Sequence, residues 1–138
     1  MITEREIIDK YLGIPYLHLG RTLKGLDCWG LPILVYKEKP EPNIEIFDLE
    51  NYEKNWALKG KNHFIDNYYE DWQRHGAPKF LDIILFKNSQ GVTNHAGIYL
   101  SKGRIIQASR HGVIISRLDG KFLERVEGIY RHIEMIKK

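Results

Sequence analysis

Apolar and polar positions follow two different rhythms along the chain, and the change of rhythm separates a helical part from a strand part. Between positions 7 and 12 the apolar residues Ile, Ile, Tyr and Leu recur at helical spacing. Thr3 and Glu6 just before them have the spacing of a capping box. The pattern predicts a first helix that begins after Thr3 and ends near Gly13.

A second apolar stretch follows the sequence GLDC. Asp27 is a good N-cap, so the pattern predicts a helix that begins near Cys28 and runs toward Lys39, where KPEP stops it. Pro32 lies just past the first turn and removes one backbone hydrogen bond, so we expect a local kink or a tight opening turn.

The segment 43–78 is polar and aromatic. Tyr68, Tyr69 and Trp72 lie at helical spacing within it, which predicts one or two helices inserted before the strand region. Aromatic residues at this spacing usually pack in a core, and the alternative is a glycan-stacking surface.

After Pro78 the sequence becomes strand-like. Five short runs are rich in Ile and Val and are divided by turns that contain Gly, Asn or Asp: FLDIILF, HAGIYLS, RIIQAS, GVIISRL and EGIYRHI. Helices followed by a series of hairpins predict an α+β fold, in which N-terminal helices pack on an antiparallel sheet of about five strands. We expect residues 1–138 to form a single domain with a helical insert at about 43–78.

Composition and charge exclude several classes of function. The 138 residues, 43% of them hydrophobic, are enough for one core. The net charge of +3 comes from Lys and Arg scattered among acidic residues, so we expect no nucleic-acid partner, although a mildly basic surface suits a polyanionic substrate. No segment has the pattern of a signal peptide or membrane span, so we expect synthesis in the cytoplasm without an export signal and no membrane insertion.

Metal and cofactor chemistry have no support in the sequence. Neither HExxH nor Cys-rich ligand spacing occurs around His18, His63, His75 or His132, and no glycine-rich loop is suited to phosphate. We therefore expect no metal and no cofactor.

The single cysteine is either a buried small hydrophobe or a nucleophile, since one cysteine cannot form an intramolecular disulfide. The pKa of a thiol falls at a helix N-terminus, because unpaired N–H groups and the helix dipole favour the thiolate. Cys28 is predicted to lie at such a terminus, which favours a nucleophile if a histidine lies near it.

His95 is the best placed of the histidines, because it opens a predicted strand. Gly97 shares its face of that strand and leaves the face open beside the imidazole. Gln107 is a polar side chain in an apolar strand, and its carbonyl oxygen is suited to accept a hydrogen bond from the imidazole. The alternative is a buried Cys28, a surface His95 and an edge-strand Gln107.

A resemblance to a known family supports the first of these interpretations. The segments YLGIPYLHLG, GLDCWGL, LDIILF, NHAGIYL, GRIIQAS, GVIIS and RVEGIYR resemble, in order, the motifs of the NlpC-type cell-wall cysteine peptidases. The Asp-Cys-x-Gly and His-x-Gly-Ile-Tyr motifs are specific as a pair. The form DCWGL, the long insert and the closing EGIYR most resemble the branch found in bacteriophage tail modules.

The resemblance implies a papain-like fold in which Cys28 is the nucleophile and His95 the base. Gln107 stands where the third catalytic residue of the family is commonly histidine, and His111 and Asn94 are rivals for that place. A glutamine can orient an imidazole but cannot carry charge.

Three further residues are implied at the substrate site. Tyr16, from the Y-x-G-x-P-Y motif, would donate to the oxyanion together with the Cys28 N–H, unless it is a core tyrosine. Asp27 caps the helix and in related enzymes contacts the peptide. Trp29 replaces a common serine and either walls the groove or packs in the core. Leu81 stands where the family usually has glycine, which leaves the form of the turn before Asp82 open.

The function implied by the resemblance is hydrolysis of an amide in peptidoglycan stem peptides, at the bond from γ-D-glutamyl to the diamino acid. Attachment to phage tail proteins and wall digestion during DNA entry are expected for the tail-associated branch. Gln107 and Pro32 motivate the alternative, a tail-tip assembly protein with a vestigial thiol site. Acyl transfer or amide hydrolysis on a non-wall substrate is a third hypothesis.

Overall fold

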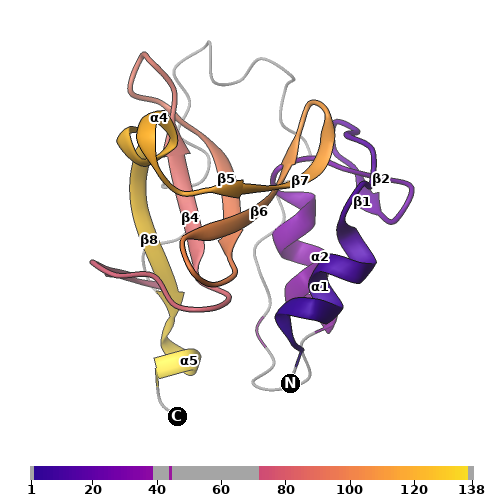
Figure 1. Cartoon of the computed structure of the whole chain (residues 1–138), viewed down its shortest axis with the longest axis horizontal. Coiled ribbons are helices and arrows are strands. Elements are labelled where there is room, and N and C mark those ends of the chain that lie inside the picture. Colours follow the sequence, from indigo (N-terminus) through magenta and orange to yellow (C-terminus); the bar gives the residue numbers. More distant parts are fainter. Residues whose placement is uncertain (1, 39–43, 45–71, 137–138) are drawn as a thin grey trace.

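In the described part of the chain, the helices α1 (Glu4–Tyr11) and α2 (Gly30–Glu38) pack with a six-stranded antiparallel sheet (Figure 1). The computed structural model describes residues 2–38, 44 and 72–136. The two helices lie together on one side of the molecule, with the short strands β1 (Arg21–Thr22) and β2 (Gly25–Leu26) between them in sequence.

The sheet contains every strand that the sequence predicts. Its order is β3-β8-β4-β5-β6-β7, with β3 Trp72–His75, β4 Ile83–Lys87, β5 Thr93–Tyr99, β6 Arg104–Ser109, β7 Gly112–Arg117 and β8 Val126–His132. All neighbouring pairs are antiparallel. Two short helices, α4 (Gly120–Glu124) and α5 (Ile133–Ile136), were not predicted.

Capping fixes the start of both long helices. The capping box of α1 is confirmed, since Thr3 and Glu6 exchange side-chain to backbone hydrogen bonds at 3.2 Å. Asp27 caps α2 by accepting from the backbone N–H groups of Trp29 at 3.1 Å and Gly30 at 2.8 Å. The cap places the helix start just after Asp27, near Cys28 as predicted, and the regular helix runs from Gly30. Pro32 lies in the first turn, where it is tolerated without interrupting the helix.

The helices and the sheet share one apolar core. Alternate residues of β4 divide between its two faces: Ile83 and Leu85 join the main core with the helices, while Ile84 and Phe86 form a smaller cluster on the other face. This alternation explains why FLDIILF is apolar almost throughout. Both of its faces are covered.

The helical prediction for segment 43–78 is wrong at its end. Trp72 begins β3, which pairs with β8 through the register Trp72↔His132. The aromatic spacing matched a helix, but pairing with β8 satisfies the backbone hydrogen bonds of this segment and buries the Trp72 ring. The ring packs edge-on against His132, with 5.1 Å between the ring centroids. Trp72 is thus a core residue, as expected, in a strand. Residues 45–71, including Tyr68 and Tyr69, lie outside the described residues.

The turn before β4 keeps a glycine-like conformation despite its leucine. Leu81 has φ of 77°, in the left-handed region that favours glycine. Its N–H donates to the Tyr99 carbonyl at 2.9 Å, its carbonyl accepts from the Tyr36 hydroxyl, and the side chain is buried. Burial of the leucine and these hydrogen bonds offset the backbone strain, so Leu81 is held in a conformation that glycine adopts more readily.

Asp82 is a structural residue at this turn. Its carboxylate is buried and accepts from the guanidinium of Arg131 at 2.6 and 2.8 Å and from the backbone N–H of Lys79 at 2.8 Å. The pair links the start of β4 to the end of β8.

Replacing Asp82 with Asn is expected to lower the free energy of unfolding by about 3 kcal/mol, because it leaves the nearly buried Arg131 without its counter-charge. Urea unfolding at neutral pH measures the change. The matched control is Asp9→Ala, which breaks an exposed ion pair with Arg5 and should change stability little. Equal effects of the two substitutions would contradict the structural role of Asp82.

Candidate active site

The thiol of Cys28 lies where the start of α2 meets β5. Its side chain is only 8% exposed, yet it lines an open cleft of about 600 Å³ together with Tyr16, His95 and Gln107. Sγ lies 3.8 Å from the carbonyl oxygen of Asn94, the residue before His95. The structure thus brings the predicted nucleophile and base to one cleft.

Asp27 fixes the backbone that carries this thiol. Besides capping α2, its carboxylate accepts from the N–H of Leu19 at 2.9 Å and from the guanidinium of Arg21 at 2.8 Å. The start of α2 and the loop before β1 lie so close together that a Cβ on Gly30 would be 2.1 Å from the carbonyl oxygen of Gly20. This close contact explains the glycine after Cys-Trp. Asp27 is 1% exposed, its carboxylate is hydrogen-bonded within the protein, and it is not among the residues that line the cleft.

A β-bulge presents His95. In the pairing of β4 with β5, Phe86 is opposite His95 but Lys87 is opposite Thr93, so Asn94 is an extra residue. A bulge residue is left out of the ladder, and the carbonyl of Asn94 is the group that contacts Cys28. The ring of His95 packs against that of Phe86, with 5.7 Å between their centroids.

Gln107 orients the imidazole. His95 Nε2 lies 2.5 Å from Gln107 Oε1, and Gln107 Nε2 donates to Ser116 Oγ at 2.9 Å. With the amide oxygen facing the ring, Nε2 of His95 carries the proton and Nδ1 is left as the basic nitrogen. Of the three candidates for this place, Gln107 is the one bonded to the ring, while Asn94 touches Cys28 through its carbonyl and His111 lies on the rim of the cleft.

The face beside Gly97 is not open as predicted. A Cβ there would meet side chains of Ile105 and Gln107 at 3.5 and 3.6 Å, so β6 already fills the space. These are ordinary van der Waals distances, and the glycine is not required by crowding.

Tyr16 is an exposed residue of the cleft and not a core tyrosine, at 41% exposure. The loop that carries it is tied to β7 through the Gly13 N–H to Val113 carbonyl bond at 2.9 Å. It is tied to β2 through Leu26, whose N–H donates to the Pro15 carbonyl at 3.0 Å. Burial and the nearby Cys28 and Asp27 raise the pKa of Tyr16 to about 12, so its hydroxyl stays a proton donor at neutral pH.

Comparison with known proteins agrees with this arrangement. The sequence model of the NlpC/P60 family matches residues 13–129, a range that contains Cys28, His95 and Gln107. The chain belongs to the NlpC/P60 family. This is a family of cysteine peptidases and hydrolases.

One relative and three solved structures illustrate the similarity. A protein of Bacillus subtilis named gamma-DL-glutamyl hydrolase is 32% identical, over 89% of this chain and 27% of that protein. The chain therefore spans about a quarter of the relative that it matches. An NlpC/P60 family protein from Bacillus cereus has a TM-score of 0.60 at 22% identity, covering 95% of this chain and 40% of that one.

Two further structures share the fold. The NlpC/p60 domain of the peptidoglycan hydrolase SagA has a TM-score of 0.60 at 20% identity, covering 94% of this chain and 99% of that one. A lipoprotein-like NLP/P60 family protein from Staphylococcus aureus has a TM-score of 0.63 at 21% identity, covering 93% and 39%. The predicted α+β, NlpC-type fold is confirmed, with six strands rather than about five.

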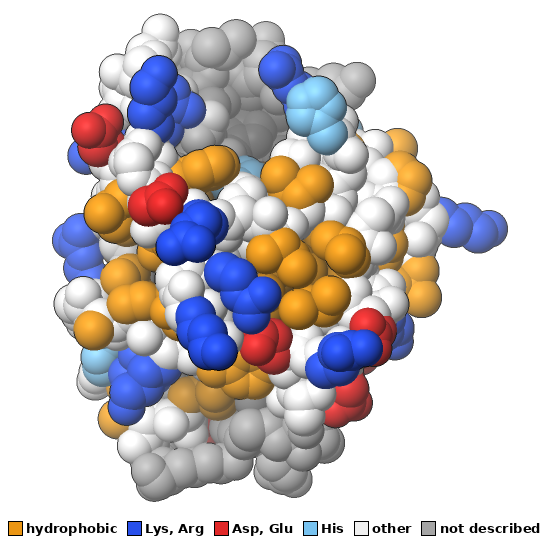
Figure 2. Space-filling view, viewed as in Figure 1, with side chains coloured by type: hydrophobic (Ala, Val, Ile, Leu, Met, Phe, Trp, Pro, Cys, Tyr) orange, Lys and Arg blue, Asp and Glu red, His pale blue; other side chains and the backbone are white. Residues whose placement is uncertain are grey.

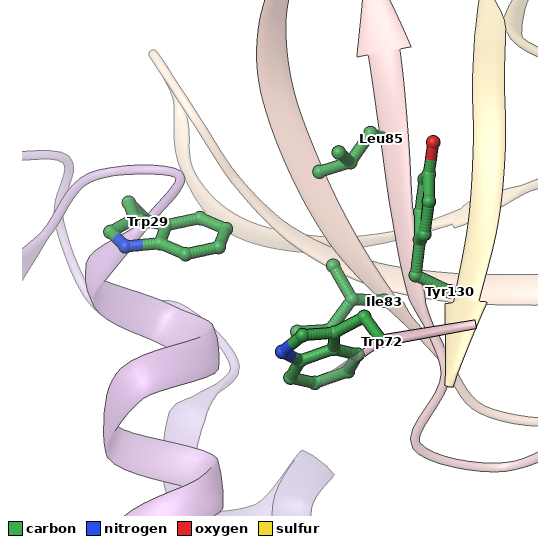
Figure 3. A pocket seen from close by; sticks show the side chains of 5 residues that line it. All are labelled: Trp29, Trp72, Ile83, Leu85 and Tyr130. Atoms are coloured by element: carbon green, nitrogen blue, oxygen red, sulfur yellow. The ribbon is translucent and has the colours of Figure 1, made fainter. Parts of the chain in front are cut away.

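Trp29 of this NlpC/P60 domain lies in the core, so the structure does not support a substrate-contacting role for it. Its side chain is 1% exposed and points from α2 toward the sheet, where it lines a small apolar cavity of about 10 Å³ with Trp72, Ile83, Leu85 and Tyr130 (Figure 3). The neighbouring Cys28 faces the cleft because successive residues at a helix start point in different directions.

The electrostatics of the thiol differ from the sequence prediction. Burial, and next the charge of Asp27, raise the pKa of Cys28 to about 12, although the backbone N–H of Ala96 and the Arg21 charge lower it. Burial also lowers the pKa of His95, against the hydrogen bond that its ring donates to Gln107. The prediction of a lowered thiol pKa is wrong, because burial and the charge of Asp27 raise the pKa of Cys28 by more than its hydrogen bonds and Arg21 lower it.

Sequence reasoning missed several residues of the cleft. They come from the end of β6, the turn after it, β7 and α4: Ser109, Arg110, Ile114 and Phe122. Phe122 packs edge-on against Phe86, with 5.8 Å between centroids, and so continues the apolar wall behind His95. Ser116 was detectable by the argument used for Gln107, since both are polar residues in apolar strands.

The described part of the chain contains neither a metal-binding cluster nor a membrane-spanning helix. Within residues 2–38, 44 and 72–136, no group of three or more His, Cys, Asp or Glu is arranged to hold a metal ion. No helix in those same ranges is long and apolar enough to cross a membrane. His63 lies outside them.

Iodoacetamide is expected to alkylate Cys28 slowly near pH 6, and the rate is expected to keep rising up to pH 10, because burial keeps the thiol protonated through the neutral range. Intact-mass spectrometry measures the rate, since the chain has one cysteine. The control is the same protein in urea, whose exposed thiol should titrate near pH 8.5, roughly its ordinary pKa. A rate plateau below pH 7, which indicates a preformed thiolate–imidazolium pair, would contradict this account.

Proposed function

We propose that the domain is a thiol hydrolase that cleaves γ-D-glutamyl amide bonds to diamino acids in peptidoglycan stem peptides. The single observation that carries the proposal is the arrangement of Cys28 and His95 in one cleft, with Gln107 bonded to Nε2 of the imidazole. This is the constellation that nucleophilic acyl transfer requires.

In the first half of the reaction Cys28 Sγ attacks the amide carbonyl. Because the pKa values of Cys28 and His95 lie far apart, the resting pair is neutral, and His95 Nδ1 takes the thiol proton as the S–C bond forms. The oxyanion accepts hydrogen bonds from the Tyr16 hydroxyl and the Cys28 N–H. Gln107 Oε1 accepts from the Nε2–H of the resulting imidazolium.

In the second half the intermediate collapses and the C–N bond breaks. His95 returns its proton to the leaving amine, which leaves a thioester on Cys28. A water molecule, deprotonated by His95, then attacks the thioester, and the carboxylic acid and the free thiol are released. Atoms and charge balance without a cofactor.

The charge of the cleft supports a γ-glutamyl substrate. Arg110 and His111 lie on its rim, and none of the residues that line it is acidic. A γ-linked glutamyl residue keeps its α-carboxylate free, so a cationic rim favours it over a neutral peptide. The name of the Bacillus subtilis relative, gamma-DL-glutamyl hydrolase, favours the same linkage and also supports a second candidate, hydrolysis of a γ-glutamyl amide outside the wall.

We further propose that the domain acts as part of a phage tail at the host cell wall, docked to tail proteins. The form DCWGL and the closing EGIYR support this proposal through their resemblance to the tail-associated branch. The two features that motivate the assembly-only alternative are compatible with a working site, since Pro32 lies in the first turn of a continuous α2 and Gln107 is bonded to His95.

Purified peptidoglycan fragments incubated with wild-type protein are expected to yield new stem-peptide products cut after γ-D-glutamate. Cys28→Ala, which removes only the sulfur, is expected to yield none. Mass spectrometry of the fragments identifies the bond. Stem peptides whose D-glutamate α-carboxylate is amidated should be cut more slowly, and Arg110→Gln should reduce that difference.

Outcomes of this experiment separate the candidates. If the protein cleaves γ-glutamyl oligomers but leaves the wall fragments uncut, the second candidate, hydrolysis of a γ-glutamyl amide outside the wall, replaces the wall substrate. Equal products from wild type and Cys28→Ala, with both proteins folded, would exclude the thiol mechanism.

Phage particles carrying Cys28→Ala are expected to contain the protein in normal amount but to infect walled cells several-fold less efficiently, because only wall digestion is lost. Plaque counts on intact cells measure the effect, and genome delivery into wall-less host cells is the control. Full infectivity of the Cys28→Ala particles on intact cells would favour the assembly-only role.

A further inference from the structure

A chain of side-chain hydrogen bonds continues beyond the catalytic glutamine to a residue that the family motifs do not assign. His95 Nε2 meets Gln107 Oε1 at 2.5 Å, and Gln107 Nε2 donates to Ser116 Oγ at 2.9 Å. The three residues lie on the adjacent strands β5, β6 and β7.

The sheet register sets this alignment. In the pairing of β6 with β7, Gln107 is opposite Ile114 and Ser116 is opposite Ile105, so Gln107 and Ser116 are diagonal neighbours on one face. A shift of one residue would turn Ser116 to the other face and break the chain.

The chemistry of the amide gives Ser116 a role. When His95 is protonated, both ring nitrogens are donors, so Gln107 can face the ring only with its oxygen. Its NH₂ group then points away from the ring and needs an acceptor, because Gln107 is 1% exposed and a buried donor without a partner is costly. Ser116 Oγ is that acceptor.

We propose that Ser116 is a positioning residue that acts through Gln107 to hold the protonated form of His95. The proposal rests on the role of His95 as base and acid in the proposed function. Ser116 itself does not line the cleft and touches no substrate.

The test compares Ser116→Thr with Ser116→Val, which have nearly the same shape and differ by the hydroxyl. Both β-branched residues suit a strand, so both variants should fold. Ser116→Val is expected to lower kcat on stem peptides about tenfold relative to Ser116→Thr, with KM changed less than twofold, because only the charged form of His95 loses support. Ser116→Thr should stay close to wild type.

Two readouts need no wall substrate. The titration midpoint of the His95 imidazole, followed by NMR, is expected to lie lower in Ser116→Val than in Ser116→Thr, and alkylation of Cys28 at pH 7 is expected to be several-fold slower. The matched control is Ser101→Ala, in the turn between β5 and β6, where the hydroxyl donates to Glu4 at 2.9 Å. It should leave both readouts unchanged.

Identical His95 titrations in the Thr and Val variants would overturn the proposal. If wild-type protein cleaves no wall peptide, the proposed function fails, but the titration and the alkylation rate still decide the role of Ser116. Loss of stability in Ser116→Val with unchanged titration and alkylation would likewise overturn it, since that pattern belongs to a merely structural serine.

Discussion

Four hydrogen-bond donors converge on the buried carboxylate of Asp27, and the position of the thiol depends on them: the N–H groups of Leu19, Trp29 and Gly30 and the guanidinium of Arg21. They join the loop before β1, β1 itself and the first residues of α2, so Cys28 has little freedom. Burial, and next the negative charge of Asp27, raise the pKa of the thiol. The surroundings that place the proposed nucleophile therefore also keep it protonated, so the proposed reaction depends on a well-oriented base.

The sheet supplies that base with comparable rigidity. The bulge at Asn94 releases one carbonyl from the ladder to contact Cys28, and the next residue, His95, is backed by the ring of Phe86. A neutral glutamine can replace a third histidine here because its task is orientation. Its amide oxygen accepts a hydrogen bond from the imidazole N–H, and its NH₂ group donates to Ser116 on the adjacent strand.

The sequence predicted the features that depend on local pattern. The capping box of α1, the Asp27 cap, the strands and the pairing of His95 with Gln107 follow from spacing and from polar residues in apolar runs. The strand at Trp72 was missed because its pairing partner, β8, lies far along the chain. The choice between groove and core for Trp29 was left open and the raised pKa of Cys28 was missed for a related reason: both depend on what packs around the helix start, which spacing does not reveal. The rim residues Arg110 and Phe122 lie in a turn and a short helix that carry no periodic signal.

The most direct test of the central claim, that Cys28 forms a covalent acyl-enzyme, is rapid-quench intact-mass spectrometry with an activated γ-D-glutamyl ester. The account predicts one added γ-glutamyl group on the wild-type protein, removed by hydroxylamine as a thioester is, and no addition to Cys28→Ala. Turnover of the ester with no adduct at any quench time, or an adduct that persists in Cys28→Ala, would contradict it.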